Sequence, residues 1–325
     1  MMDFCVLGSG ISGSTIANLL NKKYQVEVLD KAKGIGGRAS TKKINKLIRL
    51  DHGLQYFSPK TREFQKYIDA CLKKKILKVW KGNHIDFTFK NNFNSNKIIG
   101  NSGNNSLNKF LLNKVKIKFL QKIIKINFNG AYWELRSKDK LFKAKNIIIT
   151  FPFTQTKQLA RKYLSKSFLD LNIKMEPNIT VLLEQKASKN IPISSIKLND
   201  DIIAWISNEN SKKRYFSKKN YWTVQTSSKY SKKTINKYKL KKKYYSNQIK
   251  RRFGDILGID HKKLKTLLIH GWKYSYNNFS IKEKCYWNSK KRMGLCGDWF
   301  IGPNAESAWL SAHKLFDKIK KNPPK

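Results

Sequence analysis

The sequence has few acidic residues, few cysteines and no long apolar run. It holds 21 Asp and Glu against 68 Lys and Arg in 325 residues, which gives a formal charge of +47. The four cysteines form no Cys-x-x-Cys pair, which argues against a metal site or a disulfide framework and favours a reducing, cytoplasmic location. No stretch approaches the roughly 18 apolar residues of a spanning helix, and the run before Gly8 is too short for a signal peptide. We therefore expect no membrane partner.

Histidine is also rare, with five residues in the chain. None of them is placed like a general base beside a serine or cysteine nucleophile. This scarcity argues against hydrolytic chemistry and favours a reaction that a cofactor carries out.

The excess of basic residues has two explanations. Lysine, asparagine and isoleucine are abundant throughout, which is the composition that A/T-rich codons produce, and we take this as the main source of the charge. One segment could instead bind nucleic acid or an anionic surface, because no acidic residue lies between Glu209 and Asp255 and basic and aromatic residues interleave from Lys212 to Trp222. The apolar residues from Tyr245 to Ile256 follow helical spacing, however, which predicts a helix with its lysines in solvent. Nucleic acid is therefore the less favoured partner.

The most informative motif is the glycine pattern Gly-x-Gly-x-x-Gly at residues 8–13. In such a loop the first glycine, Gly8, permits a tight turn, the second, Gly10, lets the backbone approach a phosphate, and the third, Gly13, lets the helix pack closely on the strand. The motif therefore predicts a site for the pyrophosphate of a dinucleotide.

The surroundings of this motif support that prediction. Asp3 to Leu7 has the pattern of a buried strand, Ile11 to Lys22 that of a helix and Gln25 to Leu29 that of a second strand. Asp30 then ends the second strand, where a carboxylate can accept hydrogen bonds from an adenosine ribose. An ordinary strand-helix-strand unit without a ligand is the alternative.

Four later segments resemble the flavoprotein amine oxidases, and within them the renalase-like branch. Lys33 to Arg38 resembles the second, Gly-Gly-Arg loop, which adds backbone donors and a guanidinium to the FAD diphosphate. Asp51 to Phe57 resembles the Asp-His-Gly-Ala-Gln-Tyr-Phe segment of the branch, and His270 to Ser275 resembles its His-Arg-Trp-x-Tyr-Ala strand. Leu295 to Leu310 resembles its closing Cys-Gly-Asp-Trp segment and the helix that follows.

Two positions depart from the pattern of the branch. Gly271 stands where arginine is expected, and Ser307 stands where glycine is expected. If the missing arginine contacts a substrate phosphate, Lys273 or another lysine has to replace it. The segment from about Thr154 to His261 carries no recognisable motif.

The resemblance implies non-covalent FAD as the cofactor. It also implies a set of cofactor-binding residues along the chain: Gly8, Gly10, Ile11, Ser12, Gly13, Asp30, Lys31, Gly36, Gly37, Arg38, His52, Gly53, Gln55, Ile124, Thr150, Gly297, Asp298, Glu306, Ser307 and Ala308. Pro303 is expected in the first turn of a helix through Ala312, whose free amides would stabilise negative charge on the flavin.

Three residues are candidates for the catalytic, substrate-facing side. Gln55 and Tyr274 would offer hydrogen bonds, and Trp272 would supply a stacking wall. Ordinary core packing is the alternative for all three.

We expect an α/β fold with a Rossmann-like FAD-binding domain, of the type shared by amine oxidases and p-hydroxybenzoate hydroxylase, and an inserted α+β substrate domain. Residues 1–75, 98–155 and 285–325 are assigned to the first domain, and residues 76–97 and 156–284 to the second.

The resemblance implies that the flavin accepts a hydride from a dihydronicotinamide dinucleotide isomer and passes the electrons to oxygen. Such a hydride can leave without a protein base, because the remaining ring is an aromatic pyridinium. An amine oxidase or a desaturase on the same scaffold is one alternative, so the small-molecule substrate is a dinucleotide or an amine. A basic nucleic-acid or anionic-surface binding protein on a flavin fold is the alternative from another class.

Overall fold

In a computed structural model that describes residues 1–88, 97–186, 191–277 and 279–324, β1 (Met2–Leu7) lies at the centre of the largest sheet. The main path of this first sheet runs through β17 (Tyr286–Asn288), β18 (Met293–Leu295), β11 (Leu141–Ile149), β1, β2 (Val26–Leu29) and β8 (Lys116–Lys118). Neighbours on this path are parallel except for β17 and β18. An antiparallel hairpin of β9 (Lys125–Phe128) and β10 (Trp133–Arg136) extends it beside β11.

The two faces of the first sheet bury alternate residues of β1. Cys5 and Leu7 share a core with α4 (Phe153–Ala160) and α5 (Lys166–Leu169), whereas Phe4 and Val6 share one with α1 (Ile11–Leu20) and α8 (Ala305–Lys321). Successive side chains of a strand point to opposite faces, so a strand that is covered on both sides needs an almost continuous apolar run. That is why the short run before Gly8 forms a central strand.

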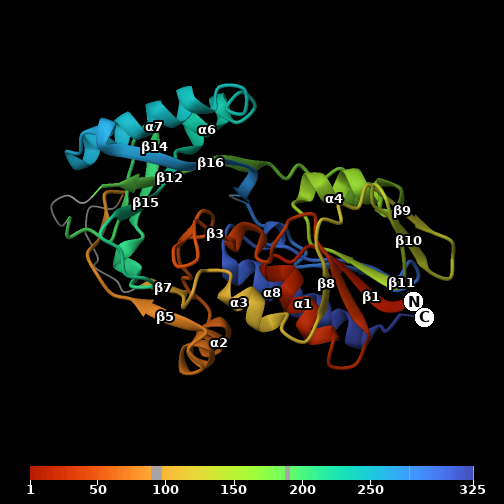
Figure 1. Cartoon of the computed structure of the whole chain (residues 1–325). Coiled ribbons are helices and arrows are strands. Elements are labelled where there is room, and N and C mark those ends of the chain that lie inside the picture. The colour runs from red at the N-terminus through yellow and green to blue at the C-terminus, as the bar shows by residue number, and fades with distance from the viewer. Residues whose placement is uncertain (89–96, 187–190, 278, 325) are drawn as a thin grey trace.

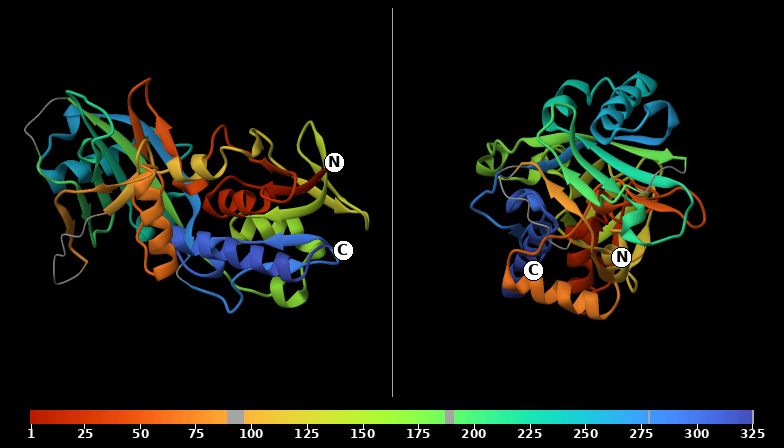
Figure 2. Two further views of the ribbon diagram at one scale, coloured as in Figure 1. Left: turned by 90° about the horizontal axis from the view of Figure 1, so that it is seen from below. Right: turned by 90° about the vertical axis from the view of Figure 1, so that its left-hand side faces the viewer.

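A second sheet lies at the other end of the molecule (Figures 1 and 2). Its order is β16 (Leu264–Asn277), β12 (Met175–Gln185), β15 (Asn220–Thr226), β14 (Ile203–Asn208), β13 (Ser195–Lys197) and β6 (His84–Asp86). Figure 1 shows α6 (Ser228–Thr234) and α7 (Lys242–Leu257) over one of its faces. The helix predicted from the spacing between Tyr245 and Ile256 is confirmed by α7, which buries Tyr245, Ile249 and Phe253.

Shorter elements complete the described chain. Two small sheets pair β3 (Thr41–Lys43) with β4 (Arg49–Asp51) and β5 (Leu77–Trp80) with β7 (Lys97–Gly100). The remaining helices are α2 (Arg62–Lys73) and α3 (Ser106–Leu111), and the 3-10 turns are η1 (Gly37–Ala39), η2 (Arg161–Tyr163), η3 (Asn210–Lys212), η4 (His261–Lys263) and η5 (Asp298–Phe300).

The expected α/β fold with a Rossmann-like unit is confirmed by the parallel order around β1. The strands of the second sheet come from residues 84–86 and 175–277. The division into two domains nevertheless stays a prediction, and residues 89–96 of its 76–97 segment lie outside the described residues.

The C-terminal helix differs from its predicted form. α8 begins at Ala305 and continues to Lys321, well beyond Ala312. The side chain of Asn304 accepts a hydrogen bond from the Ser307 amide at 2.8 Å and thereby caps the helix, so Pro303 precedes the cap instead of lying in the first turn.

Candidate functional site

The carboxyl ends of the central parallel strands meet at one edge of the first sheet. β1 is followed by Gly8, β2 by Asp30, β11 by Thr150 and β18 by the segment Cys296 to Asp298. Ligands of open α/β sheets bind at this edge. A cavity of about 800 Å³ lies here, and the second sheet supplies its opposite wall.

Gly10 leaves open space in this cavity. A Cβ atom added at Gly10 would meet no atom within 4 Å, although the residue lines the cavity. Its backbone is in the extended region, with φ at −69°, so its conformation does not require glycine. Gly13 differs, because a Cβ there would lie 2.0 Å from the carbonyl oxygen of Gly8. Gly13 therefore allows the helix to pack closely on the strand, and Gly10 leaves room for a ligand.

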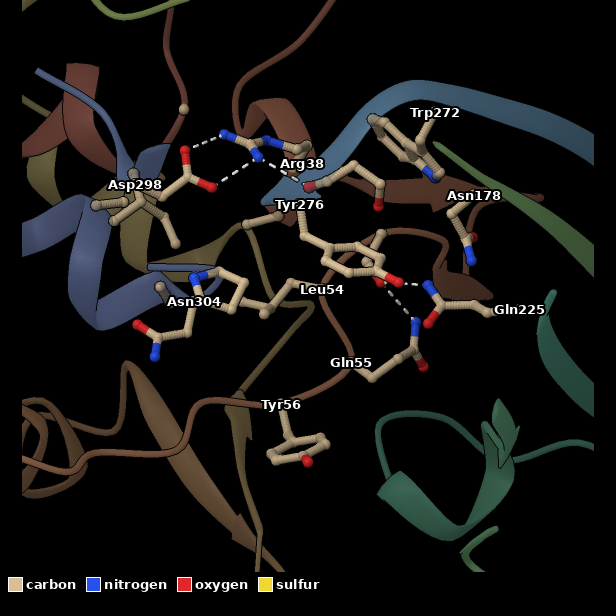
Figure 3. Close-up of a pocket in the computed structure, with 18 of the residues that line it drawn as sticks. Arg38, Leu54, Gln55, Tyr56, Asn178, Gln225, Trp272, Tyr276, Asp298 and Asn304 are labelled. Carbon is tan, nitrogen blue, oxygen red and sulfur yellow. Dashed lines mark hydrogen bonds and ion pairs between the residues drawn. The ribbon is translucent and has the colours of Figure 1, made fainter. Parts of the chain in front are cut away.

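Arg38 and Asp298 form a bidentate ion pair in the cavity wall (Figure 3). The Nη1 and Nη2 atoms of Arg38 lie 2.7 Å and 2.6 Å from the carboxylate oxygens of Asp298, and Nη1 also donates to the carbonyl oxygen of Ser275 at 2.8 Å. A guanidinium has five N–H donors, so Nε and one hydrogen on Nη2 remain for a ligand. The pair can thus hold Arg38 in place and still leave it able to bind a phosphate.

The N-terminus of α8 faces the same cavity. Pro303, Asn304, Ala305 and Ala308 line it. The Asn304 cap uses the amide of Ser307, so this bond leaves the earlier amides of the helix available. A helix N-terminus carries partial positive charge and stabilises an anion in front of it.

The cavity gathers about half of the residues predicted from the sequence. Those that line it are Gly10, Ile11, Ser12, Gly36, Arg38, Gly53, Gln55, Thr150, Trp272, Asp298 and Ala308. Those that do not are Gly8, Gly13, Asp30, Lys31, Gly37, His52, Ile124, Tyr274, Gly297, Glu306 and Ser307.

Several residues outside the lining have protein partners instead. The Asp30 carboxylate accepts hydrogen bonds from the Ser9 amide and hydroxyl at 2.7 Å and 2.5 Å and from the Ala32 amide at 2.8 Å. The buried Glu306 carboxylate accepts from the amides of Lys60 and Thr61 at 2.8 Å and 2.7 Å. These carboxylates therefore position the glycine loop and the start of α2, and the assignment of Glu306 to the cofactor rests on its backbone amide at the N-terminus of α8.

Two other positions lie on the surface. The side chain of Ile124 is exposed, and its amide donates to the carbonyl oxygen of Arg136. Lys31 is also exposed. Neither is among the residues that line the cavity.

On β16 the tyrosine that lines the cavity is Tyr276 and not Tyr274. Tyr276 lines the cavity together with Trp272, and Tyr274 does not. The reason is a register shift, since Asn178 of β12 pairs with Trp272 whereas Glu176 pairs with Tyr276. Two residues on β12 thus span four on β16, and a bulge of this kind changes which side chains face the cavity.

Sequence reasoning also missed the wall that the second sheet provides. Asn178, Lys197, Trp205 and Gln225 line the cavity, and all come from the segment without a motif. Tyr56 lines it as well and follows Gln55 directly, so the Asp51 to Phe57 segment could have indicated it.

Aromatic and cationic side chains adjoin on this wall. The rings of Tyr56 and Trp205 lie 5.4 Å apart, and the Nζ atom of Lys97 lies 4.5 Å from the centre of the Tyr56 ring. Among the described residues that line the cavity, Asp298 is the one carboxylate, and it is paired with Arg38. The cavity therefore offers positive charge to a ligand and no unpaired negative charge.

Part of the acid-free segment is buried, although other lysines in it, such as Lys218 and Lys242, are exposed. Lys212 and Arg214 are buried and form ion pairs with Asp51, and the rings of Tyr221 and Trp222 are buried too. Buried cations and rings cannot contact phosphates or stack on bases. These four residues therefore do not support the nucleic-acid alternative, which stays the less favoured expectation.

His52 lies behind the cavity and positions Trp272. Its carbonyl oxygen accepts a hydrogen bond from the Trp272 indole at 3.0 Å, and its ring lies 5.4 Å from the His270 ring. Burial and the neighbouring His270 lower the pKa of His52 to about 4. Its Nδ1 atom is buried without a hydrogen-bond partner among the described residues. At neutral pH we therefore treat His52 as an uncharged, structural residue.

This assignment predicts how stability changes with pH. Because the pKa of His52 is lower in the folded state, the unfolded chain binds the proton first, and stability falls as the pH drops from about 6.5 toward 4. We expect His52→Phe to flatten this dependence in urea unfolding curves recorded between pH 7 and pH 5. A variant with the full wild-type slope would contradict the assignment.

No helix in the described part of the chain is both long and apolar enough to cross a membrane. Nor do the described residues contain a cluster of His, Cys, Asp and Glu side chains that could hold a metal ion.

Comparisons with known proteins agree with this geometry. Residues 6–71 match a family model described as an NAD(P)-binding Rossmann-like domain. A candidate protoporphyrinogen oxidase from Exiguobacterium sp. 255-15 is similar with a TM-score of 0.72 and 10% identity, over 98% of each chain. Wild-type putrescine oxidase bound to putrescine is similar with a TM-score of 0.70 and 10% identity, over 98% of this chain and 99% of that one.

A third similar structure is the PF1083 protein from Pyrococcus furiosus, with a TM-score of 0.65 and 12% identity over 98% of each chain. Identities this low show the fold alone. The chain therefore carries a Rossmann-like dinucleotide-binding domain within an α/β fold of the amine oxidase type.

Proposed function

We propose that the protein is an FAD-dependent oxidoreductase that takes a hydride from a dihydronicotinamide dinucleotide isomer and passes the electrons to oxygen. The charge of the cavity carries this proposal. Lys60 and Lys197 line it beside Arg38, whose remaining donors the FAD diphosphate would use. Lys197 also lies 3.3 Å from Asp86, and the carboxylate among the described lining residues, Asp298, is paired with Arg38. Such a cavity suits a substrate that bears phosphates.

The residues around the cavity fit FAD. The open space at Gly10 and the remaining donors of Arg38 would hold the diphosphate, and the N-terminus of α8 would face the part of the ring that becomes negative. When bound, FAD supplies the two-electron redox chemistry.

The side chains on the substrate side would bind the substrate and orient it. The indole of Trp272 donates a hydrogen bond to the carbonyl oxygen of His52, which holds the ring in place. The ring can therefore form a fixed wall for a planar substrate. Gln55 is buried and lines the same cavity. Histidine is not found among the described lining residues, which suits a hydride donor whose product is aromatic without loss of a proton.

An amine oxidase is the second candidate. Aromatic side chains of Tyr56, Trp205, Trp272 and Tyr276 line the cavity, and aromatic rings can bind a cation. Similarity to the putrescine-bound oxidase favours this candidate as well. However, Lys97 already covers the Tyr56 ring, and the lining has no unpaired carboxylate to hold an ammonium group. The dinucleotide substrate is therefore preferred.

Anaerobic reduction of the flavin distinguishes the two candidates. We expect dihydronicotinamide dinucleotides with the hydride at C2 or C6 to bleach the flavin absorbance at least about a hundredfold faster than putrescine, which is about 2.7 kcal/mol in activation free energy. The measurement is a stopped-flow trace of purified, FAD-loaded protein, followed by admission of oxygen and assay of peroxide. Faster bleaching by amines would establish the second candidate instead.

A further inference from the structure

Two glutamines on the substrate side are anchored to the same backbone oxygen. The Nε2 atom of Gln55 donates to the carbonyl oxygens of Gly53 at 3.0 Å and Asp51 at 3.1 Å, and the Nε2 atom of Gln225 donates to Gly53 at 2.7 Å (Figure 3). A carbonyl oxygen only accepts hydrogen bonds, so the amide nitrogens must face it. The orientation of both side-chain amides is thereby fixed.

This orientation leaves two acceptors without donors. The Oε1 atom of Gln55 is buried and has no hydrogen-bond partner among the described residues, and the whole residue is 5% exposed. None of the hydrogen bonds of the described residues reaches the Oε1 atom of Gln225 either. Both residues line the cavity. A buried acceptor without a donor is destabilising, so a donor on a ligand would be stabilising here.

Gln225 lies away from Asp298 and from the N-terminus of α8. In Figure 3, Asp298 and Asn304 lie on one side of the cavity, Gln225 and Asn178 lie on the other, and the Tyr276 ring lies between them. Gln225 comes from β15 in the second sheet. Gln225 therefore belongs to the substrate side, and Gln55, which the sequence assigned to both sides, shares its anchor on Gly53.

We propose that Gln55 and Gln225 select a substrate that carries a primary carboxamide, whose N–H groups they bind, over the corresponding carboxylate. This inference rests on the proposed function and deepens it, since a nicotinamide ring carries a carboxamide and a nicotinic acid ring does not. A carboxylate only accepts hydrogen bonds and would face two fixed acceptors. Sites built to bind an N–H group discriminate strongly against analogues that lack it.

The positive charge of the cavity opposes the proposed preference for a carboxamide over a carboxylate. Lys60 lines the cavity, and so does Lys197, whose Nζ atom lies 3.3 Å from Asp86. Positive charge here would by itself favour an anion over a neutral amide. A preference for the amide therefore has to come from hydrogen bonding and not from charge.

Calorimetric titration of the FAD-loaded protein with benzamide and with benzoate measures this preference directly. We expect benzamide to bind at least about tenfold more tightly than benzoate, or about 1.4 kcal/mol. Gln225→Met removes one acceptor at similar volume and should reduce that ratio severalfold. Gln65→Met is the matched control, since Gln65 lies on α2 and bonds to Asp69 outside the cavity.

Three results would overturn the inference. They are equal or tighter binding of benzoate by the wild type, binding of neither probe, and a Gln225→Met variant whose flavin absorbance shifts while the amide-to-acid ratio stays the same. The last result would mean that the glutamines contact the cofactor. A benzamide preference in a protein whose flavin no dihydronicotinamide isomer reduces would refute the proposed function and leave this inference standing.

Discussion

Replacing Gly10 with valine is expected to leave a folded protein almost without flavin. A Cβ atom at this position meets nothing in the protein, and the extended backbone accepts a β-branched residue without strain. The valine side chain would instead occupy the space in which a diphosphate approaches the loop. We expect FAD affinity to fall at least about a hundredfold, which corresponds to about 2.7 kcal/mol.

The measurement is the ratio of flavin to protein absorbance after purification, followed by titration with added FAD. Gly34→Val is the matched control, because Gly34 is exposed, has equally open surroundings and does not line the cavity. Thermal unfolding of the flavin-free proteins should give similar midpoints for both variants. Full flavin retention by the Gly10 variant would show that the diphosphate does not bind at this loop.

Gly10 gives a cleaner test than Arg38. The buried carboxylate of Asp298 lies 2.6 Å from the guanidinium of Arg38. Removing the guanidinium would therefore leave this carboxylate without its partner. An unpaired buried charge destabilises the fold, so loss of flavin from Arg38→Ala would have two explanations.

The sequence predicted those parts of the site that depend on local patterns. The glycine loop and the strand before it follow from residues close together in the chain, and so does the helix at the C-terminus. The start of that helix was misplaced by two residues because Asn304, not Pro303, provides the side chain that caps it.

Features that depend on pairing between distant strands could not be predicted in this way. Tyr276 replaces Tyr274 because β16 shifts its register against β12, about a hundred residues earlier in the chain. Gln225 enters the site because β15 brings it to the carbonyl oxygen of Gly53, 172 residues away. Nothing near Gln225 in the sequence distinguishes it from an ordinary strand residue.

The environment of the charged residues between Lys212 and Trp222 could not be predicted from the sequence either. The composition around Lys212 suggests a solvated or nucleic-acid-binding surface, yet its Nζ atom lies 3.0 Å from Asp51 and 2.7 Å from Glu209. Asp51 is 161 residues away in sequence. Composition does not show this, because a buried lysine needs a carboxylate partner, and here the fold supplies that partner.

Replacing Lys212 with methionine is expected to destabilise the protein severely. Lys212 and Arg214 balance Asp51 and Glu209 in a fully buried cluster, which joins η3 to the β4 segment that leads to Gly53 and Gln55. Loss of one cation leaves a buried carboxylate uncompensated, which costs about 3–5 kcal/mol. Urea unfolding should show this as a lower midpoint with an unchanged slope.

Lys219→Met is the matched control for Lys212. Its ammonium lies 2.9 Å from Glu184 in a pair whose lysine is half exposed, so the same substitution should have a far smaller effect. Glu209→Gln combined with Lys212→Met removes one charge of each sign, and we expect the double variant to lose less stability than the two single changes together. Equal losses at Lys212 and Lys219 would show that the buried cluster contributes no more than a surface pair.

Acid should weaken the same cluster. Burial favours the neutral form of Asp51, but Arg214, Lys212 and the Asn104 amide outweigh it and lower the pKa of this carboxyl below its usual range. A lowered pKa means that the unfolded chain takes up the proton first, so the stabilisation is complete above the ordinary aspartate pKa and declines as the pH falls below it. Asp51→Asn should therefore be less stable than wild type at pH 7, and the difference should shrink below about pH 4. A difference that stays constant down to pH 3 would mean that the Asp51 charge does not contribute to folding, and that the cluster acts through packing and neutral hydrogen bonds alone.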